Sequence, residues 1–386
     1  AALAALAPPP SPANSKPEAQ PAPATPPAAG APDPGSAEIE FTCSGPFKLE
    51  SVLLPDPNSP PKSKIVLDLS KSVDIRQRPE GMRLRAQDVH LVLDGVTKQM
   101  ELVHGEGEVE AEVQGKTMRG AKLNMEMSYS PEGQATHQQI TLDGDREKKT
   151  DAFLLMGANA IRSAAFSMDG ITGSLWAAQG AVARMKMPAQ PPGAGKPDPA
   201  PKPAPAAQGG LMGGFGMSGG GSVALQCDGP FHYDGTAGLL KASQQVLIKK
   251  EDMTILAHEL EIAFEKPPAA VKQPDAPPPG MLDGKLKSLT CQGRVEVIGA
   301  GRVVHCDRFV WDLAADKASL EMLEPEADVL VYTKAPSGGT QLVEIRHRLE
   351  VDMQTNYITP ASRVFMAPYK DKAPRPRVVA SGGAKP

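Results

Sequence analysis

Residues 286–313 read LKSLTCQGRVEVIGAGRVVHCDRFVWDL, and this stretch decides the fold class. Its last five residues, FVWDL, place apolar side chains at every second position, which is the period of a β-strand with one apolar face. A dinucleotide-binding loop needs a third glycine at the sixth position and a helix after it, but Val304 stands there and a second alternating run follows. The GAG at 299–301 therefore predicts a hairpin turn in which glycine supplies a positive φ.

The same pattern occurs earlier in the chain. Residues 100–127, MELVHGEGEVEAEVQGKTMRGAKLNMEM, align with 286–313 without a gap, and Gly107 and Gly115 fall on Gly293 and Gly301. A second pair of similar stretches precedes them, FTCSGPFKLE at 41–50 and LQCDGPFHYD at 225–234. The chain therefore contains an internal duplication.

A smaller unit recurs inside each copy. It consists of a small residue, two further residues, and then three apolar residues at alternate positions. The three-residue gap changes the phase of the alternation, which predicts a bulge or corner at the small residue. Each unit is thus expected to be strand, corner, strand and turn. The four clearest units are Ala86/Val89/Leu91/Leu93, Gly120/Leu123/Met125/Met127, Ala257/Leu260/Ile262/Phe264 and Cys306/Phe309/Trp311/Leu313.

Composition sets the domain boundaries. The chain has 386 residues, and its 40 prolines gather in segments that bury too little apolar surface to fold. The best helical candidate, TDAFLLMGANAIRSAAF at 150–166, is weakened by Gly157 and Ser163, so we predict an all-β fold. The predicted parts are a disordered Pro/Ala-rich tether over 1–37, a β domain over 38–187, a Pro/Gly-rich linker over 188–221, a second β domain over 222–366 and a disordered tail over 367–386.

Charge and cysteine content exclude several classes of function. A net charge of −4 does not indicate nucleic-acid binding, which needs a basic face. Cys43, Cys227, Cys291 and Cys306 show no CxxC spacing, so a zinc site is not expected, and disulfides are possible but not required. The opening AALAALA is either the end of a secretory leader or an Ala-rich start to the tether, and we favour export.

Catalytic constellations are missing from the sequence. His305, Cys306 and Asp307 are adjacent, but neighbours on a strand point to opposite faces and cannot converge on one ion. The duplicated position reads Arg119-Gly120-Ala121, so the repeat does not require those residue types. No GxSxG elbow and no HExxH pair occurs. We therefore expect no catalytic residue, metal or cofactor.

Three stretches together indicate a family. MRLRAQDVHLVLDG (82–95), MTILAHELEIAFE (253–265) and GRVEVIGAGRVVHCDRFVWDLAADKASLEM (293–322) resemble the organic solvent tolerance (OstA)-like domain. That family includes periplasmic lipopolysaccharide-transport proteins of the LptA and LptC type and the N-terminal region of LptD. The chain differs from the pattern in its Pro-rich tether and linker, in long insertions at 52–64 and 266–282, and in carrying two copies.

The resemblance implies two tandem OstA-like β-jellyroll domains, each a folded-over antiparallel sheet with an apolar groove. It further implies periplasmic transport of lipopolysaccharide or a similar acylated lipid, and docking to other bridge proteins of the envelope through edge strands. The alternative is a structural or adaptor protein of the envelope whose sheets enclose a filled core and carry no lipid. On the transport hypothesis, the groove is lined by Leu91, Leu93, Met125, Met127, Ile262, Phe264, Phe309, Trp311 and Leu313.

Overall fold

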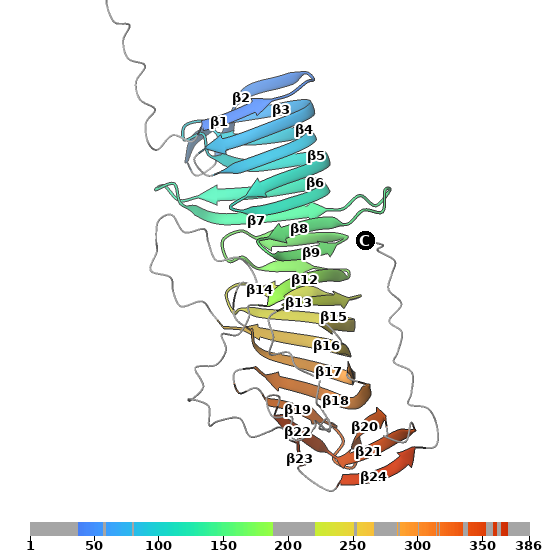
Figure 1. Ribbon diagram of the computed structural model, residues 1–386. Helices are drawn as coiled ribbons and strands as arrows, with labels where there is room; N and C mark the ends of the chain where they lie inside the picture. Colours follow the sequence, from blue (N-terminus) through green and yellow to red (C-terminus); the bar gives the residue numbers. More distant parts are fainter. Residues whose placement is uncertain are drawn as a thin grey trace, which may run out of the picture. The chain divides into compact units, whose positions relative to one another are not determined.

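The computed structural model of the chain (Figure 1) describes residues 38–56, 59–78, 81–187, 221–250, 253–265, 284, 286–299, 301–313, 315, 317–334, 339–352, 358–360 and 364–369. These residues belong to one compact unit that begins at Ala37. The predicted tether, the predicted linker up to 220 and the predicted tail beyond 369 lie outside the described residues.

Every regular element in the described part of the chain is a β-strand, and the strands pair antiparallel, which confirms the all-β prediction. The first twelve strands are β1 (Glu38–Thr42), β2 (Phe47–Asp56), β3 (Ser59–Arg78), β4 (Met82–Asp94), β5 (Met100–Val113), β6 (Lys116–Tyr129), β7 (Ala135–Asp143), β8 (Ala152–Met156), β9 (Asn159–Ser163), β10 (Ala165–Asp169), β11 (Leu175–Ala177) and β12 (Ala181–Met187). The others are β13 (Gly221–Cys227), β14 (Phe231–Asp234), β15 (Leu239–Lys250), β16 (Met253–Phe264), β17 (Leu286–Gly299), β18 (Arg302–Asp312), β19 (Lys317–Glu321), β20 (Asp328–Lys334), β21 (Thr340–Arg346), β22 (Arg348–Asp352), β23 (Ile358–Pro360) and β24 (Val364–Tyr369).

Residues 150–166, the best helical candidate, are not helical. They form β8, β9 and the start of β10, with Gly157 at a φ of 57° in the turn between β8 and β9. Burial alternates along both β8 and β9, so the segment follows period two on each side of that turn. Gly157 therefore lies in a turn between two strands and not inside a helix.

The strands form two continuous ladders of hydrogen bonds. Ladder A runs through β1, β3, β4, β5, β6, β8, β9, β12, β13, β15, β16, β17, β18, β20, β21 and β24. Ladder B runs through β2, β3, β4, β5, β6, β7, β10, β11, β14, β15, β16, β17, β18, β19, β22 and β23. The long strands β3–β6 and β15–β18, visible in Figure 1, contribute one half to each ladder.

Each long strand changes ladder at an interruption of its register. The pairing of β4 with β5 slips between Arg85 and Asp88, and that of β16 with β17 slips between Leu256 and Glu259. These are the corners that the three-residue gap predicts. The positive φ angles, however, fall on the neighbouring strands, at Lys71/Ser72, Gly107/Glu108, Gln244/Gln245 and Gly293/Arg294. The small residue is needed because the backbone of another strand passes close to it. A Cβ at Gly120 would lie 2.5 Å from the carbonyl oxygen of Asp143.

The duplication is visible in matching contacts. In both copies the thiol sulfur of the first cysteine lies 3.5 Å from a glycine carbonyl oxygen, Cys43 to Gly45 and Cys227 to Gly229. The amide of each glycine donates a 3.0 Å hydrogen bond across the corner, to Ser70 in the first copy and to Ser243 in the second. The Cys-x-Gly-Pro-Phe stretch therefore carries the chain from ladder A to ladder B at the start of each copy.

The two copies join through both ladders. In ladder A, β12 of the first copy pairs with β13 of the second along its whole length, and Figure 1 shows the two strands side by side. In ladder B, β11 pairs with β14. The apolar faces of both ladders contribute to a single core cluster that runs from Leu67 to Val351. The core therefore continues through the junction without a break.

Candidate functional site

The nine residues predicted to line a groove all lie on ladder B. They come from β4, β6, β16 and β18 and the turn after β18. Cross-strand pairing places Leu91 and Met125 on either side of Val103, and Ile262 and Trp311 on either side of Leu289. The structure thus gathers them into one row in each copy, both on the inner face of the ladder.

These side chains are buried. Leu91 is 0% exposed and Trp311 1%, and Leu93, Phe264 and Leu313 reach only 7–8%. Met127 is the exception, being partly buried against the core. A side chain that lined an open groove would contact water, so the space between the ladders is closed at these positions. Their role in binding a lipid stays a prediction.

Ladder A supplies the opposite wall of the interior. Its inner face presents Ile75, Leu84, Met118, Leu154, Ile161, Leu225, Val297, Val304 and Val331, each 0–1% exposed. These residues were not predicted from the sequence, because only the apolar run after each corner was assigned to the groove. The run before the corner has the same period-two signal and would have identified them.

Each ladder has an edge on the side opposite the corners, here called its margin. The two margins carry different side chains. At the ladder B margin most inner side chains are apolar or aromatic, although the buried Gln138 lies opposite Met127, and Tyr233 packs edge-on against Phe264 with ring centroids 6.0 Å apart. At the ladder A margin the last inner position of several strands is polar instead. Strand alternation places Gln77, Lys116, Asn159, Lys250 and Arg302 there, on the same face as buried apolar residues two positions away.

Lys116 and Arg302 occupy equivalent places at this margin. Each is the first residue of a strand after a glycine with positive φ, Gly115 at 75° and Gly301 at 76°. Burial lowers the pKa of both side chains. These two cations were not predicted from the sequence, although the gap-free alignment of 100–127 with 286–313 places them in the apolar phase of both copies.

Edge strands form the first end of the described unit. Within the described residues, β1 and β2 pair only with β3, so each has one unpaired edge. Register with Leu67 and Leu69 puts Phe47 and Leu49 on the inner face, yet Phe47 is 62% and Leu49 56% exposed. Leu53 is 69% exposed on the same strand. Among the described residues, no further strand therefore covers the apolar interior at this end.

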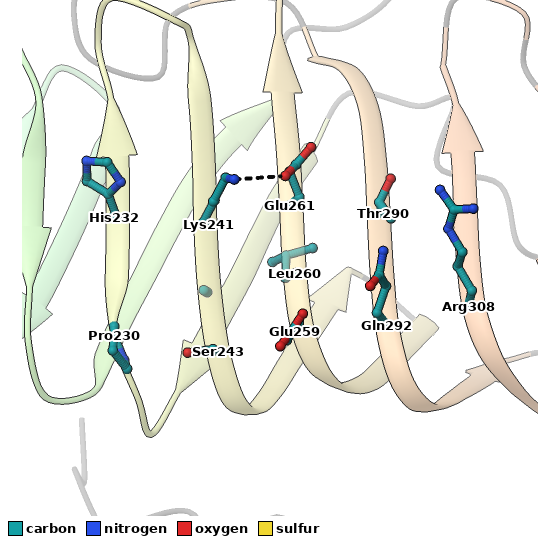
Figure 2. A pocket seen from close by; sticks show the side chains of 11 residues that line it. Pro230, His232, Lys241, Ser243, Glu259, Leu260, Glu261, Thr290, Gln292 and Arg308 are labelled. Atoms are coloured by element: carbon teal, nitrogen blue, oxygen red, sulfur yellow. Dashed lines mark ion pairs between the residues drawn. The ribbon is translucent and has the colours of Figure 1, made fainter. Parts of the chain in front are cut away.

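A polar concavity of about 450 Å³ lies on the outer face of ladder B in the second copy. Figure 2 shows two cross-strand rows of side chains from β14 to β18 around it, with Lys241 and Glu261 paired at 3.3 Å. Glu259 and Gln292 belong to the second row. No serine or cysteine in it contacts a base among the residues described, so it offers hydrogen bonds and charge but no activated nucleophile.

The His305, Cys306 and Asp307 side chains diverge, as predicted. His305 lies 3.7 Å from the carboxylate of Glu296 and packs edge-on against Tyr332. Cys306 is buried in the core, and Asp307 accepts a 3.0 Å hydrogen bond from the Leu323 amide. All four cysteines are free thiols, and burial raises the pKa of Cys291 and Cys306, so these two are poor nucleophiles.

Two further features are absent from the described residues. These residues contain no cluster of three or more His, Cys, Asp or Glu side chains arranged to hold a metal ion. They also contain no helix with the length and apolar character to cross a bilayer.

Comparison of the chain with protein-family models, with curated proteins and with solved structures found no match. Any function assigned to the chain therefore rests on its sequence and its geometry.

Proposed function

We propose that the protein is a non-enzymatic carrier that moves a lipopolysaccharide-like lipid across the periplasm during outer-membrane biogenesis. One observation carries the proposal: the apolar interior continues through the junction of the two copies, bounded by an unbroken ladder on each side. Such a path gives an acyl chain the same apolar surroundings along both copies. Apolar burial is worth about 25 cal/mol per Å², so an acyl chain is held without polar chemistry.

Lipid entry requires the two margins to separate. The hydrogen bonds of the fold run between strands within each ladder, and the ladders are covalently continuous at the corners. Parting the margins therefore breaks side-chain packing but no ladder hydrogen bond. The inner residues at the margins, such as Met82, Leu93 and Leu313 at 5–7% exposed, are already less enclosed than those of the central rows.

The proposed partners are other bridge proteins of the envelope that present a pair of edge strands. The junction inside the chain supports this proposal, because Phe231, the counterpart of Phe47, lies on a strand that pairs with β11 and is 0% exposed. Phe47 and the free edges of β1 and β2 present the same features uncovered. A partner with a matching strand pair would extend both ladders and cover the exposed apolar side chains.

The burial of the predicted groove residues favours a second candidate, a structural adaptor of the cell envelope without lipid cargo. On this hypothesis the interior is a permanent core, as the 0–2% exposure of Leu91, Met125 and Phe309 suggests. Edge-strand docking would then be the function in its own right.

Photo-crosslinking separates the two candidates. A crosslinking residue replaces Met127 or Leu313 at the margin, or the adjacent outward-facing Glu126 or Asp312 as a matched control on the same strand. The proteins are irradiated with lipopolysaccharide. Transport predicts capture at 127 and 313 and little at 126 and 312. Equal capture at inner and outer positions, or none, would remove the carrier proposal and leave the adaptor.

A further inference from the structure

The margin of ladder A places cations beside the apolar interior. Lys116 follows Gly115 at the start of β6, and its cross-strand neighbours Val113 and Met156 are both buried core residues. In the second copy Arg302 follows Gly301 at the start of β18, on the same face as the fully buried Val304. The duplication has therefore kept a cation at one inward-facing position while the residue type changed.

The second copy adds another cation at this margin. Lys250 ends β15 on the same face as Ile248, and its counterpart at the end of β3 is Gln77, on the same face as Ile75. Inner positions this close to the core are usually apolar, as the ladder B margin shows with Leu93, Phe264 and Leu313. Three cations thus lie at the inner positions of the ladder A margin, Lys116, Lys250 and Arg302, among neutral polar and apolar residues.

Lys116 has no opposing charge in the described part of the chain. No carboxylate among those residues lies within ion-pairing distance of its ammonium group. Removing a charge from water without a partner is costly, so the position carries a penalty that an anion would relieve. The aliphatic stem also covers apolar surface, and a purely structural role would consist of that cover alone.

We propose that Lys116 and Arg302 bind the anionic headgroup of an amphiphile whose acyl chains lie between the two ladders. This inference rests on the proposed function, because it requires acyl chains in the interior. The substrate class is then an acylated lipid with a phosphate or carboxylate close to its acyl chains. The two sites lie at equivalent points of the two copies, so a headgroup released at the first meets the same chemistry at the second.

The test compares two probes with the same acyl chains, of which only one carries an anionic headgroup, dipalmitoyl phosphatidic acid and the uncharged dipalmitoylglycerol. Binding of each to the full chain is measured by displacement of a fluorescent fatty acid. The wild type is expected to prefer the anionic probe about tenfold, the ratio that one charge-assisted hydrogen bond provides. K116Q/R302Q should reduce that preference to near parity while leaving the affinity for the neutral probe unchanged.

The chain offers a matched control. Lys122 and Arg308 are also equivalent in the two copies, lie on the same strands β6 and β18, and point outward to Glu106 and Glu321. K122Q/R308Q removes the same charges and should keep the tenfold preference. The charge-retaining variant K116R/R302K should keep it too, which separates headgroup binding from the packing of the stems.

The outcomes distinguish the two levels of the proposal. Binding of both probes with equal affinity by the wild type overturns the headgroup inference and leaves the carrier intact. A preference for the anionic probe that survives in K116Q/R302Q also overturns the headgroup inference and leaves the carrier proposal intact. If neither probe binds the wild type, the carrier proposal itself fails, and the inference fails with it. The wild-type comparison decides between these outcomes even if K116Q/R302Q does not fold.

Discussion

Gly293 faces His258 across the corner between β16 and β17, and a Cβ at Gly293 would lie 2.8 Å from the Cβ of His258. Gly107 stands in the same relation to Gln87 in the first copy, at 2.7 Å. Both glycines have a φ near 77°, at 78° and 76°. The corner therefore needs glycine for two reasons, the backbone angle and the lack of room for a side chain.

We expect G293A to lower the free energy of unfolding by about 2–3 kcal/mol, since strain at positive φ adds to a steric clash. The control is G301A, because Gly301 has a φ of 76° but nothing within 4 Å of its Cβ position. G301A should lower the free energy of unfolding by about 1 kcal/mol, because only the positive φ angle is unfavourable for alanine. Urea denaturation measures both. Equal losses would show that the corner is not sterically constrained.

The junction of the two copies gives a second comparison. Phe231 is fully buried under β11, whereas its counterpart Phe47 is 62% exposed at the end of the unit. F231A should destabilise the chain by about 3–4 kcal/mol, the usual cost of a large core deletion. F47A should change stability by less than about 0.5 kcal/mol. Similar values for the two variants in thermal unfolding would contradict the covered junction that the structure shows.

Asp74 and Arg83 predict an acid-dependent part of the stability. Arg83 donates hydrogen bonds of 2.7 and 3.2 Å to the two carboxylate oxygens of Asp74, and this contact lowers the pKa of Asp74 below its ordinary value of 3.8. The folded chain thus binds that proton more weakly than the unfolded chain. The stabilisation is complete above pH 3.8 and is lost as the pH falls through the lower, folded pKa.

D74N should therefore destabilise the protein by about 1 kcal/mol at pH 7, and the difference from the wild type should shrink as the pH falls below 3.8. D88N serves as the control, because Asp88 is exposed on the outer face of the next strand. It should be nearly neutral at every pH. A D74N penalty that does not depend on pH would show that the carboxylate charge contributes nothing.

Lys116 predicts a second rise of stability with pH, in the alkaline range, because here the charged form is the one that the fold disfavours. Burial lowers its pKa from the ordinary 10.5, so the folded chain favours the neutral amine and stability rises with pH between the lowered value and 10.5. K116M should remove this slope and stabilise the chain by about 1 kcal/mol at pH 7. K122M on the outer face should be neutral or slightly destabilising, because it breaks the exposed ion pair with Glu106. A loss of stability in K116M would show that the cation supports the fold.

The sequence identified the strands well because period-two alternation is a local property. The hairpin at 299–301 is confirmed by the pairing of Gly299 with Arg302, and the phase change after Ala86 and Ala257 marked the corners. The strand carrying the positive φ angles was not predictable, because Lys71/Ser72 and Gln244/Gln245 have no glycine to mark them.

The long-range features of the candidate site were harder to predict. Continuity of both ladders through β11–β14 and β12–β13 depends on partners far apart in the sequence. The local sequence of Phe47 matches that of the buried Phe231. Phe47 is nevertheless exposed, because among the described residues β2 pairs only with β3. Identical motifs thus acquire different surroundings from their position in the chain. The burial of Leu91 and Trp311 likewise depends on the facing ladder, which periodicity alone does not place.

The way in which the second copy begins has an evolutionary consequence. Because a copy starts with the same Cys-x-Gly-Pro-Phe turn whether it is terminal or internal, a further duplication would insert new strands in the middle and leave both terminal strand pairs unchanged. Each inserted strand advances a ladder by about 4.8 Å. Reach between two binding partners could therefore be adjusted by copy number, without a new interface having to be selected at either end.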